Sequence, residues 1–252
     1  MPRKPRMLSE SGYYHVTLRG AGKMILFEGR DDYLACLGLV RKYAEKTSIA
    51  IVAYCLMSNH IHLIVRDDGN ALSGFVRRLA TSFALRYNER TSHVGHVFQD
   101  RFFSVPIESD ESLLGAVRYV HQNPLKAEIS SIEDYEWSSY HAYLSDPGFL
   151  DVNPVLGQFA STESFVTFMH EVNDSYTMPD LYRKKLTDDE AIKVMREVLS
   201  QEEMDALSGD SRSKRDSALR KLKEADIGVA QACRLTGLGK GIVNRAYAAA
   251  RR

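Results

Sequence analysis

Two apolar segments, residues 49–57 and 61–65, are separated by only three residues that include Ser58 and Asn59. Short apolar runs bounded by turn residues predict buried strands, and so short a separation predicts a hairpin. The longer run is far below the 18 or more apolar residues that a membrane-spanning helix needs, so no membrane segment is expected. The chain is therefore expected to build its first domain around a sheet that contains this hairpin.

The segments on either side of the hairpin alternate between strand and helix patterns. Aromatic and β-branched residues predict a strand at residues 13–19, and residues 97–107 form another strand region. Apolar residues at helical spacing predict helices at residues 31–46, 72–88 and 113–123. The order is typical of an α+β domain with helices on one face of an antiparallel sheet.

The charge of the chain cancels between neighbouring segments. The whole chain holds 33 basic and 33 acidic residues, whereas residues 151–211 have a net charge of −8 and residues 212–252 a net charge of +8. A basic terminal module indicates nucleic acid as a partner. We expect three parts: a domain at residues 1–145, a connector and acidic helical region at residues 146–211, and a basic module at residues 212–252.

The N-terminus and the cysteines indicate the compartment. The basic residues at the start are followed by no apolar stretch of the kind found in secretory signals. The three cysteines are scattered and form no Cys-X-X-Cys pair, which argues against a cysteine zinc site. We expect a cytoplasmic protein associated with the nucleoid.

The basic end has the pattern of a helix-turn-helix. Two short helices are predicted around the glycine-containing turn at residues 236–239, and a charged helix precedes them. The second helix would present Lys240, Asn244 and Arg245 to a DNA groove. A three-helix packing module with a cationic surface is the alternative interpretation.

A pair of histidines lies at the start of the second hairpin strand. Alternate residues of a strand point to the same side of the sheet, so His60 and His62 face one way and Ile61 faces the other. This is how a strand can present two nitrogen ligands to one metal ion. Two partly buried, hydrogen-bonded histidines without a metal are the alternative.

A tyrosine and an asparagine lie one helical turn apart near residue 120. On a helical wheel, Tyr119 and Asn123 fall together on the flank of the apolar stripe, so a phenol and an amide can reach the same site. Pro124 disfavours helical geometry in the residue before it, which places the helix end near Asn123. A half-buried aromatic residue and a helix-end asparagine are the alternative.

These segments together resemble a known family. The motifs appear in collinear order over about residues 6–144, and several separate motifs match. They resemble the REP-associated tyrosine transposases, within the wider group of HUH single-tyrosine transposases; the matching segments are YHVTLRG at 14–20, HIH at 60–62, GHVFQDRF at 95–102, YVHQNP at 119–124 and WSSY at 137–140.

The resemblance implies a ferredoxin-like fold and a metal-dependent reaction on DNA. It implies that His60 and His62 hold Mg²⁺ or Mn²⁺ and that Tyr119 is the nucleophile. The third metal ligand of the family is an amide one turn after the tyrosine, which corresponds to Asn123, where many relatives have Gln. Cleavage would produce a 5′-phosphotyrosine, and the expected substrate is single-stranded DNA next to a hairpin or repeated palindrome.

Several cations are candidates for contacts with the DNA backbone. They lie in the N-terminal tail, on the outer face of the helix at 72–88, in the strand region near residue 100, and in the basic module; outside that module they are Arg3, Lys4, Arg6, Arg77, Arg78, Arg86 and Arg101. A solvated surface charge is the alternative for each. The protein is expected to be a monomer or a homodimer.

Three functions are compatible with these residues. The leading one is a single-stranded DNA endonuclease and strand transferase, because His60, His62 and Tyr119 are all present. A DNA-binding regulator with the same fold and no cleavage activity is the alternative. An unrelated metal hydrolase, in which Tyr119 is structural, is the third.

Overall fold

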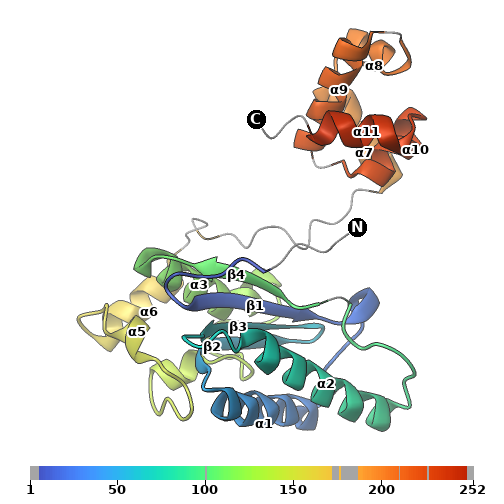
Figure 1. The fold of residues 1–252 in the computed structure, drawn as a ribbon. Helices are drawn as coiled ribbons and strands as arrows, with labels where there is room; N and C mark the ends of the chain where they lie inside the picture. The colour runs from blue at the N-terminus through green and yellow to red at the C-terminus, as the bar shows by residue number, and fades with distance from the viewer. Residues whose placement is uncertain are drawn as a thin grey trace. The chain divides into compact units, whose positions relative to one another are not determined.

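The structure is a computed structural model, and it consists of two compact units, Met1–Pro179 and Asp180–Arg252. Figure 1 shows the helices and strands of both units. The structure describes residues 6–99, 101–171, 176, 187–209, 211–225 and 227–248. No helix among these residues is long and apolar enough to cross a membrane.

The first unit is built on a four-stranded antiparallel sheet. Its strands are β1 (Tyr13–Arg19), β2 (Ala50–Met57), β3 (His60–Arg66) and β4 (Phe103–Ile107), in the spatial order β2-β3-β1-β4. The hairpin predicted from the two apolar segments is confirmed as β2 and β3. With one helix between β1 and β2 and another between β3 and β4, the order is the βαββαβ arrangement of the ferredoxin-like fold.

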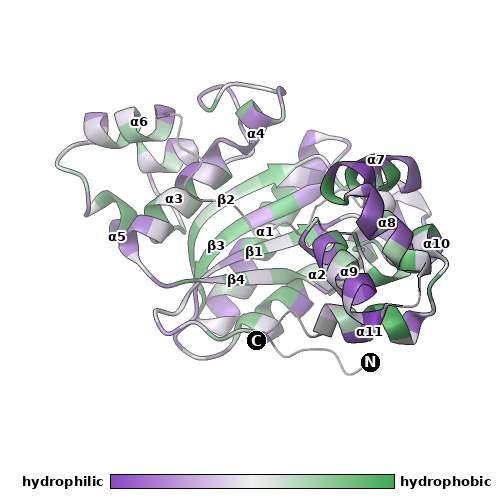
Figure 2. Cartoon of the chain, turned by 90° about the horizontal axis from the view of Figure 1, so that it is seen from above, coloured by the Kyte–Doolittle hydropathy of each residue, from purple (hydrophilic) through white to green (hydrophobic). Residues whose placement is uncertain are grey.

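The two helices within the βαββαβ arrangement lie on one face of the sheet, as the sequence predicted, and a further helix covers the other face. The helices α1 (Arg30–Thr47) and α2 (Leu72–Thr91) pack on one face, and α3 (Asp110–His121) packs on the other (Figure 1). The reason lies in the strands, because β2 and β3 carry buried residues on both sides and not in simple alternation. Figure 2 shows these strands as mainly hydrophobic.

The fourth strand is shorter than predicted. The strand region expected at residues 97–107 is a strand only over Phe103–Ile107, and Phe98 forms an isolated bridge with Gly20. Gly20 follows the last residue of β1, and the backbone of Met24 lies close to it. A Cβ on Gly20 would be 2.5 Å from the backbone oxygen of Met24. The short helix η1 (Ala21–Lys23) follows at once.

The chain after α3 completes the core on that face of the sheet. The short helix α4 (Asn123–Lys126) follows α3 directly, with Pro124 in its first turn. Further on lie η2 (Tyr140–Tyr143), α5 (Asn153–Leu156) and α6 (Thr162–His170). Their buried side chains join the core under α3; these are Tyr140, Tyr143, Val155, Phe165 and Met169.

The second unit is an all-helical bundle. It consists of α7 (Asp188–Val198), α8 (Gln201–Ser208), α9 (Arg212–Glu224), α10 (Val229–Thr236) and α11 (Lys240–Ala248). The turn predicted between the last two helices is present, and Gly237 takes the left-handed conformation that favours glycine, with a φ of 71°. The exposed face of α9 is strongly hydrophilic (Figure 2).

The acidic helices belong to the same unit as the basic ones. Ala191, Leu199 and Leu207, from the region predicted as a connector, are buried in one core with residues of α9–α11. Ion pairs also join the acidic helices to the basic ones. Nη2 of Arg234 lies 2.7 Å from Oδ1 of Asp188, and Nζ of Lys221 lies 2.8 Å from Oε1 of Glu203. This division differs from the predicted boundaries at 145 and 211, because α5 and α6 pack with the sheet and α7 and α8 pack with the basic helices.

Candidate active site

The two histidines of β3 lie on the face of the sheet that α3 covers. The ring centres of His60 and His62 are 4.8 Å apart and their planes are nearly perpendicular, at 86°. The side chain of Ile61, between them, is buried in the core on the opposite face. His62 is only 1% exposed, whereas His60 is partly exposed and its Nδ1 lies 2.7 Å from Oδ1 of Asn59.

The tyrosine of α3 lies against this pair. The ring centre of Tyr119 is 5.9 Å from that of His62 and 5.7 Å from that of His15 on β1. The position follows from the helix, because Leu113, Val117 and Val120 are buried against the sheet and hold Tyr119 on the flank of this apolar stripe.

Asn123 reaches the same place from the start of α4. Its side chain hydrogen-bonds His60, and its Nδ2 also donates to the backbone oxygen of Tyr119 over 3.3 Å. The helix α3 ends at His121, so Asn123 does not continue it as the helical wheel assumed. The four predicted residues His60, His62, Tyr119 and Asn123 are nevertheless together, although they come from three separate elements.

Burial keeps the imidazoles of this site neutral. Desolvation lowers the pKa of His15 to about 3 and the pKa of His62 well below its usual value. Desolvation and the nearby charge of Arg19 lower the pKa of His60 to about 4, and its hydrogen bond with Asn123 opposes this shift. A neutral imidazole offers a lone pair, which is the form that binds a metal ion.

Lys126 and Tyr176, to which the sequence assigned no role, also lie next to Tyr119. Nζ of Lys126 lies 5.3 Å from the ring centre of Tyr119. The ring of Tyr176 lies 5.9 Å from that of Tyr119, and its Oη lies 3.1 Å from Nδ1 of His15. Tyr176 follows Tyr119 by more than fifty residues and belongs to no motif, so no local signal could have found it.

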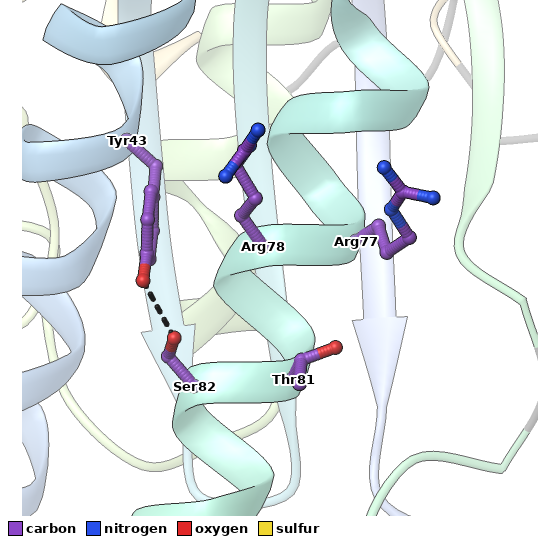
Figure 3. Close-up of a pocket in the computed structure, with 5 residues that line it drawn as sticks. All are labelled: Tyr43, Arg77, Arg78, Thr81 and Ser82. Carbon is purple, nitrogen blue, oxygen red and sulfur yellow. Dashed lines mark hydrogen bonds between the residues drawn. The ribbon is translucent and has the colours of Figure 1, made fainter.

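The candidate DNA contacts do not gather at this site. Arg77 and Arg78 line an open pocket of about 320 Å³ together with Tyr43, Thr81 and Ser82, on the helices that cover the opposite face of the sheet (Figure 3). Within the part of the chain that the structure describes, neither guanidinium forms an ion pair. Ser82 is held by the hydroxyl of Tyr43, with 2.6 Å between the two oxygens.

The remaining candidates are scattered. Arg6 donates to Oδ1 of Asn70 over 2.8 Å and stacks on Tyr14, while Arg86 and Arg101 are exposed. In the second unit, Lys240 and Arg245 are exposed and Asn244 is partly buried. Arg3 and Lys4 lie outside the described residues.

To hold a metal ion, His60 and His62 would need a third ligand that is not a His, Cys, Asp or Glu side chain. Among the described residues, no group of three His, Cys, Asp or Glu side chains is arranged to hold a metal ion. His60 and His62 with the amide of Asn123 form a donor set of two nitrogens and one oxygen. This set fits a divalent ion that takes its further ligands from water and phosphate.

Comparison with known proteins shows what the first unit is similar to. The unit has a ferredoxin-like sheet that carries His60 and His62 with Tyr119 beside them. Residues 9–123 match the family model described as "Transposase IS200 like". This segment is less than half of the chain, contains the whole sheet, α3 and all four residues of the site, and is similar to the IS200-like transposases. This similarity supports a transposase-like role in DNA processing.

Two solved structures are similar to this chain. One is a REP-associated tyrosine transposase bound to a REP hairpin, with 17% identity and a TM-score of 0.48 over 60% of this chain and 90% of that one. The other is a candidate transposase from Deinococcus radiodurans R1, with 14% identity and a TM-score of 0.34 over 52% of this chain and 99% of that one. No curated protein matches the chain significantly.

Proposed function

We propose that the first unit is a metal-dependent endonuclease and strand transferase for single-stranded DNA next to a hairpin. The observation that carries this proposal is the convergence of the Tyr119 phenol on His60, His62 and Asn123, which come from separate elements. One chain supplies all four groups, so the proposed site needs no residue from a second copy. The match of residues 9–123 to the model of the IS200-like transposases supports the same reaction class.

The proposed metal ligands are His60, His62 and Asn123. Both imidazoles are neutral because burial lowers the pKa of each, so neither needs to lose a proton before binding. A bound Mg²⁺ or Mn²⁺ would polarise the scissile phosphate and offset its negative charge. Asn123 holds its place through its hydrogen bonds to His60 and to the backbone of Tyr119.

Tyr119 is the proposed nucleophile. Its Oη attacks the phosphorus, the bond between phosphorus and the 3′ oxygen breaks, and the phenol proton is replaced by the 5′-phosphoryl group. The departing 3′ oxygen takes up a proton and leaves as a free hydroxyl. Because the phosphotyrosine retains the energy of the original phosphodiester, a 3′-hydroxyl can reverse the step and join DNA without a nucleotide cofactor.

The test is a covalent adduct between protein and DNA. The full chain is incubated with Mn²⁺ and labelled single-stranded hairpin DNA, and a denaturing gel is searched for a labelled protein band. Tyr119→Phe should abolish this band. Tyr176→Phe is tested beside it, because Tyr176 is a second tyrosine near the histidines, and the matched control that should leave the band in place is Tyr54→Phe, on the opposite face of the sheet.

Each other outcome points to a different function. Loss of the adduct in Tyr176→Phe alone would make Tyr176 the nucleophile. Cleavage without any adduct would favour a metal hydrolase in which Tyr119 is structural. DNA binding with neither cleavage nor adduct over a series of hairpins would favour a DNA-binding regulator.

We also propose that the pocket on α1 and α2 contacts the DNA backbone. Arg77 and Arg78 are exposed beside the hydroxyls of Thr81 and Ser82, a combination that suits phosphate oxygens. Replacing both arginines by Gln should reduce the slope of log affinity against log salt for single-stranded DNA by about 1.4, at roughly 0.7 per phosphate contact. An unchanged slope would refute this contact.

The second unit is proposed to bind DNA through α11. Lys240 and Arg245 are exposed on this helix and Asn244 lies between them. Deletion of residues 212–252 would expose the apolar faces of α7 and α8, so point variants are the better test. Lys240→Gln with Arg245→Gln should weaken DNA binding and lower its salt dependence, and equal binding would exclude α11 as the contact.

A further inference from the structure

A chain of hydrogen bonds leads away from Nδ1 of His62. Nδ1 of His62 lies 2.9 Å from Nε2 of His15, and Nδ1 of His15 lies 3.1 Å from Oη of Tyr176. Thr17, directly opposite His62 in the β1–β3 register, places its Oγ1 3.3 Å from the same Nδ1. His15, Thr17 and His62 are all at most 2% exposed.

The chain can run in two directions, because a neutral imidazole carries one proton on one nitrogen. In the first direction, His62 donates from Nδ1 to Nε2 of His15, and His15 donates from Nδ1 to Oη of Tyr176. His62 then has a lone pair on Nε2. In the second direction, Tyr176 donates to His15 and His15 donates to His62, which leaves a proton on Nε2 of His62 and blocks it as a ligand.

His60 shows a similar arrangement, and the partner of its Nδ1 is a carboxamide oxygen, which can only accept a hydrogen bond. Nδ1 of His60 lies 2.7 Å from the carboxamide oxygen of Asn59, so it is Nδ1 of His60 that carries the proton. Nε2 of His60 is therefore left with its lone pair. For both imidazoles, a neighbour holds Nδ1 and the side facing away is Nε2.

We propose that His15 is a positioning residue whose Nε2 accepts a hydrogen bond from the Nδ1–H of His62. This hydrogen bond fixes the ring orientation and the tautomer of His62, so that the lone pair on its Nε2 is available to a metal ion. The inference rests on the proposed function in one respect, that His62 is a metal ligand. Tyr176 supports the arrangement as the acceptor for His15. Metal-binding histidines commonly donate their other nitrogen to such an acceptor, and its loss costs roughly 10- to 100-fold in metal affinity.

The first test is the tautomer of His62 in the metal-free full chain. Nitrogen-15 chemical shifts of imidazoles distinguish a protonated nitrogen from one with a lone pair, and comparison with His62→Gln assigns the signals. We expect Nδ1 of His62 to be protonated and Nε2 to carry the lone pair. Protonation at Nε2 would overturn the inference.

The second test compares two amide variants that differ only in where the polar group lies. His15→Gln places its amide near the position of Nε2 and can still accept from His62, whereas His15→Asn places its amide near Nδ1 and cannot. Mn²⁺ affinity, read from the paramagnetic resonance signal of free Mn²⁺, should fall at least about tenfold in His15→Asn and stay within about threefold of the wild type in His15→Gln. Equal affinities in the two variants would overturn the inference.

Thr17→Val is the matched control for the weaker contact. It removes the hydroxyl at 3.3 Å with little change in volume and should leave Mn²⁺ affinity within about threefold. A loss as large as that of His15→Asn would assign the role to Thr17 and overturn the inference. If the wild-type chain itself bound no Mn²⁺, the proposed metal site would fail, and the nitrogen shifts of the metal-free chain would decide separately whether His15 sets the tautomer of His62.

Discussion

The buried histidine of α3 predicts a specific loss of stability in acid. His121 is fully buried and its Nε2 lies 2.8 Å from Oγ of Ser139. Burial lowers its pKa to about 3 in the folded chain, whereas an unfolded histidine titrates near pH 6.5. Between these values the unfolded chain binds one more proton than the folded chain, so the free energy of unfolding decreases as pH falls below 6.5 and is unaffected above it.

The size of the effect follows from these two pKa values. At pH 5 the unfolded imidazole lies 1.5 pH units below its pKa of about 6.5, which at about 1.36 kcal/mol per unit stabilises the unfolded state by about 2 kcal/mol. His121→Gln cannot take up this proton and retains a side-chain amide that can bond Ser139. The loss of stability between pH 8 and pH 5 should therefore be about 2 kcal/mol smaller in the variant than in the wild type.

The assay is urea unfolding in the presence of a chelator, followed by tryptophan fluorescence. Trp137 is the sole tryptophan of the chain and lies in the first unit, stacked on Tyr33 with 4.3 Å between ring centres. The control is Val120→Ala, which leaves a cavity in the core beside the same helix and adds no titrating group. It should lower the free energy of unfolding equally at both pH values. A difference between pH 8 and pH 5 that is unchanged in His121→Gln would refute the reasoning.

Three further predictions concern stability. Gly20→Ala should lower the free energy of unfolding by about 1–3 kcal/mol, because its Cβ would meet the backbone of Met24, whereas Gly38→Ala in α1 meets no atom within 4 Å and should raise it by about 0.5–1 kcal/mol; thermal unfolding compares the two. Asp67→Ala should cost about 1–2 kcal/mol in the same assay, because this buried carboxylate accepts from the first backbone N–H groups of α2, and an unchanged midpoint would argue against capping. Leu222→Ala should cost the second unit about 2–5 kcal/mol by circular dichroism while the Trp137 fluorescence transition stays in place, and a joint shift would contradict the division into two units.

Local patterns predicted much of the first unit. The spacing of apolar residues predicted the hairpin and the three long helices to within a few residues of their observed ends. The alternation of side chains along a strand predicted that His60 and His62 share a face. The proximity of Tyr119 to these histidines needed the resemblance to a family as well, because the order of elements alone does not say which helix covers which face.

Long-range packing accounts for what the sequence did not reveal. Nothing within the segment around Tyr176 indicates that it contacts His15, which lies 161 residues earlier in the chain. Helices on both faces of the sheet depend on which apolar residues meet after folding, and so does the membership of α7 and α8 in the second unit. Sequence composition marked α7 and α8 as a separate acidic region because charge was counted without knowing the neighbours of each residue.

Ion pairs between the acidic and the basic helices of the second unit change how its charge acts. The segment 212–252 has a net charge of +8 by sequence, but Arg234 and Lys221 already contact Asp188 and Glu203. A phosphate that approached either cation would have to displace a carboxylate held in the same unit, so these acids act as intramolecular competitors of DNA. The unit should therefore contact DNA through other exposed cations such as Lys240 and Arg245, and a count of basic residues overstates its attraction to nucleic acid.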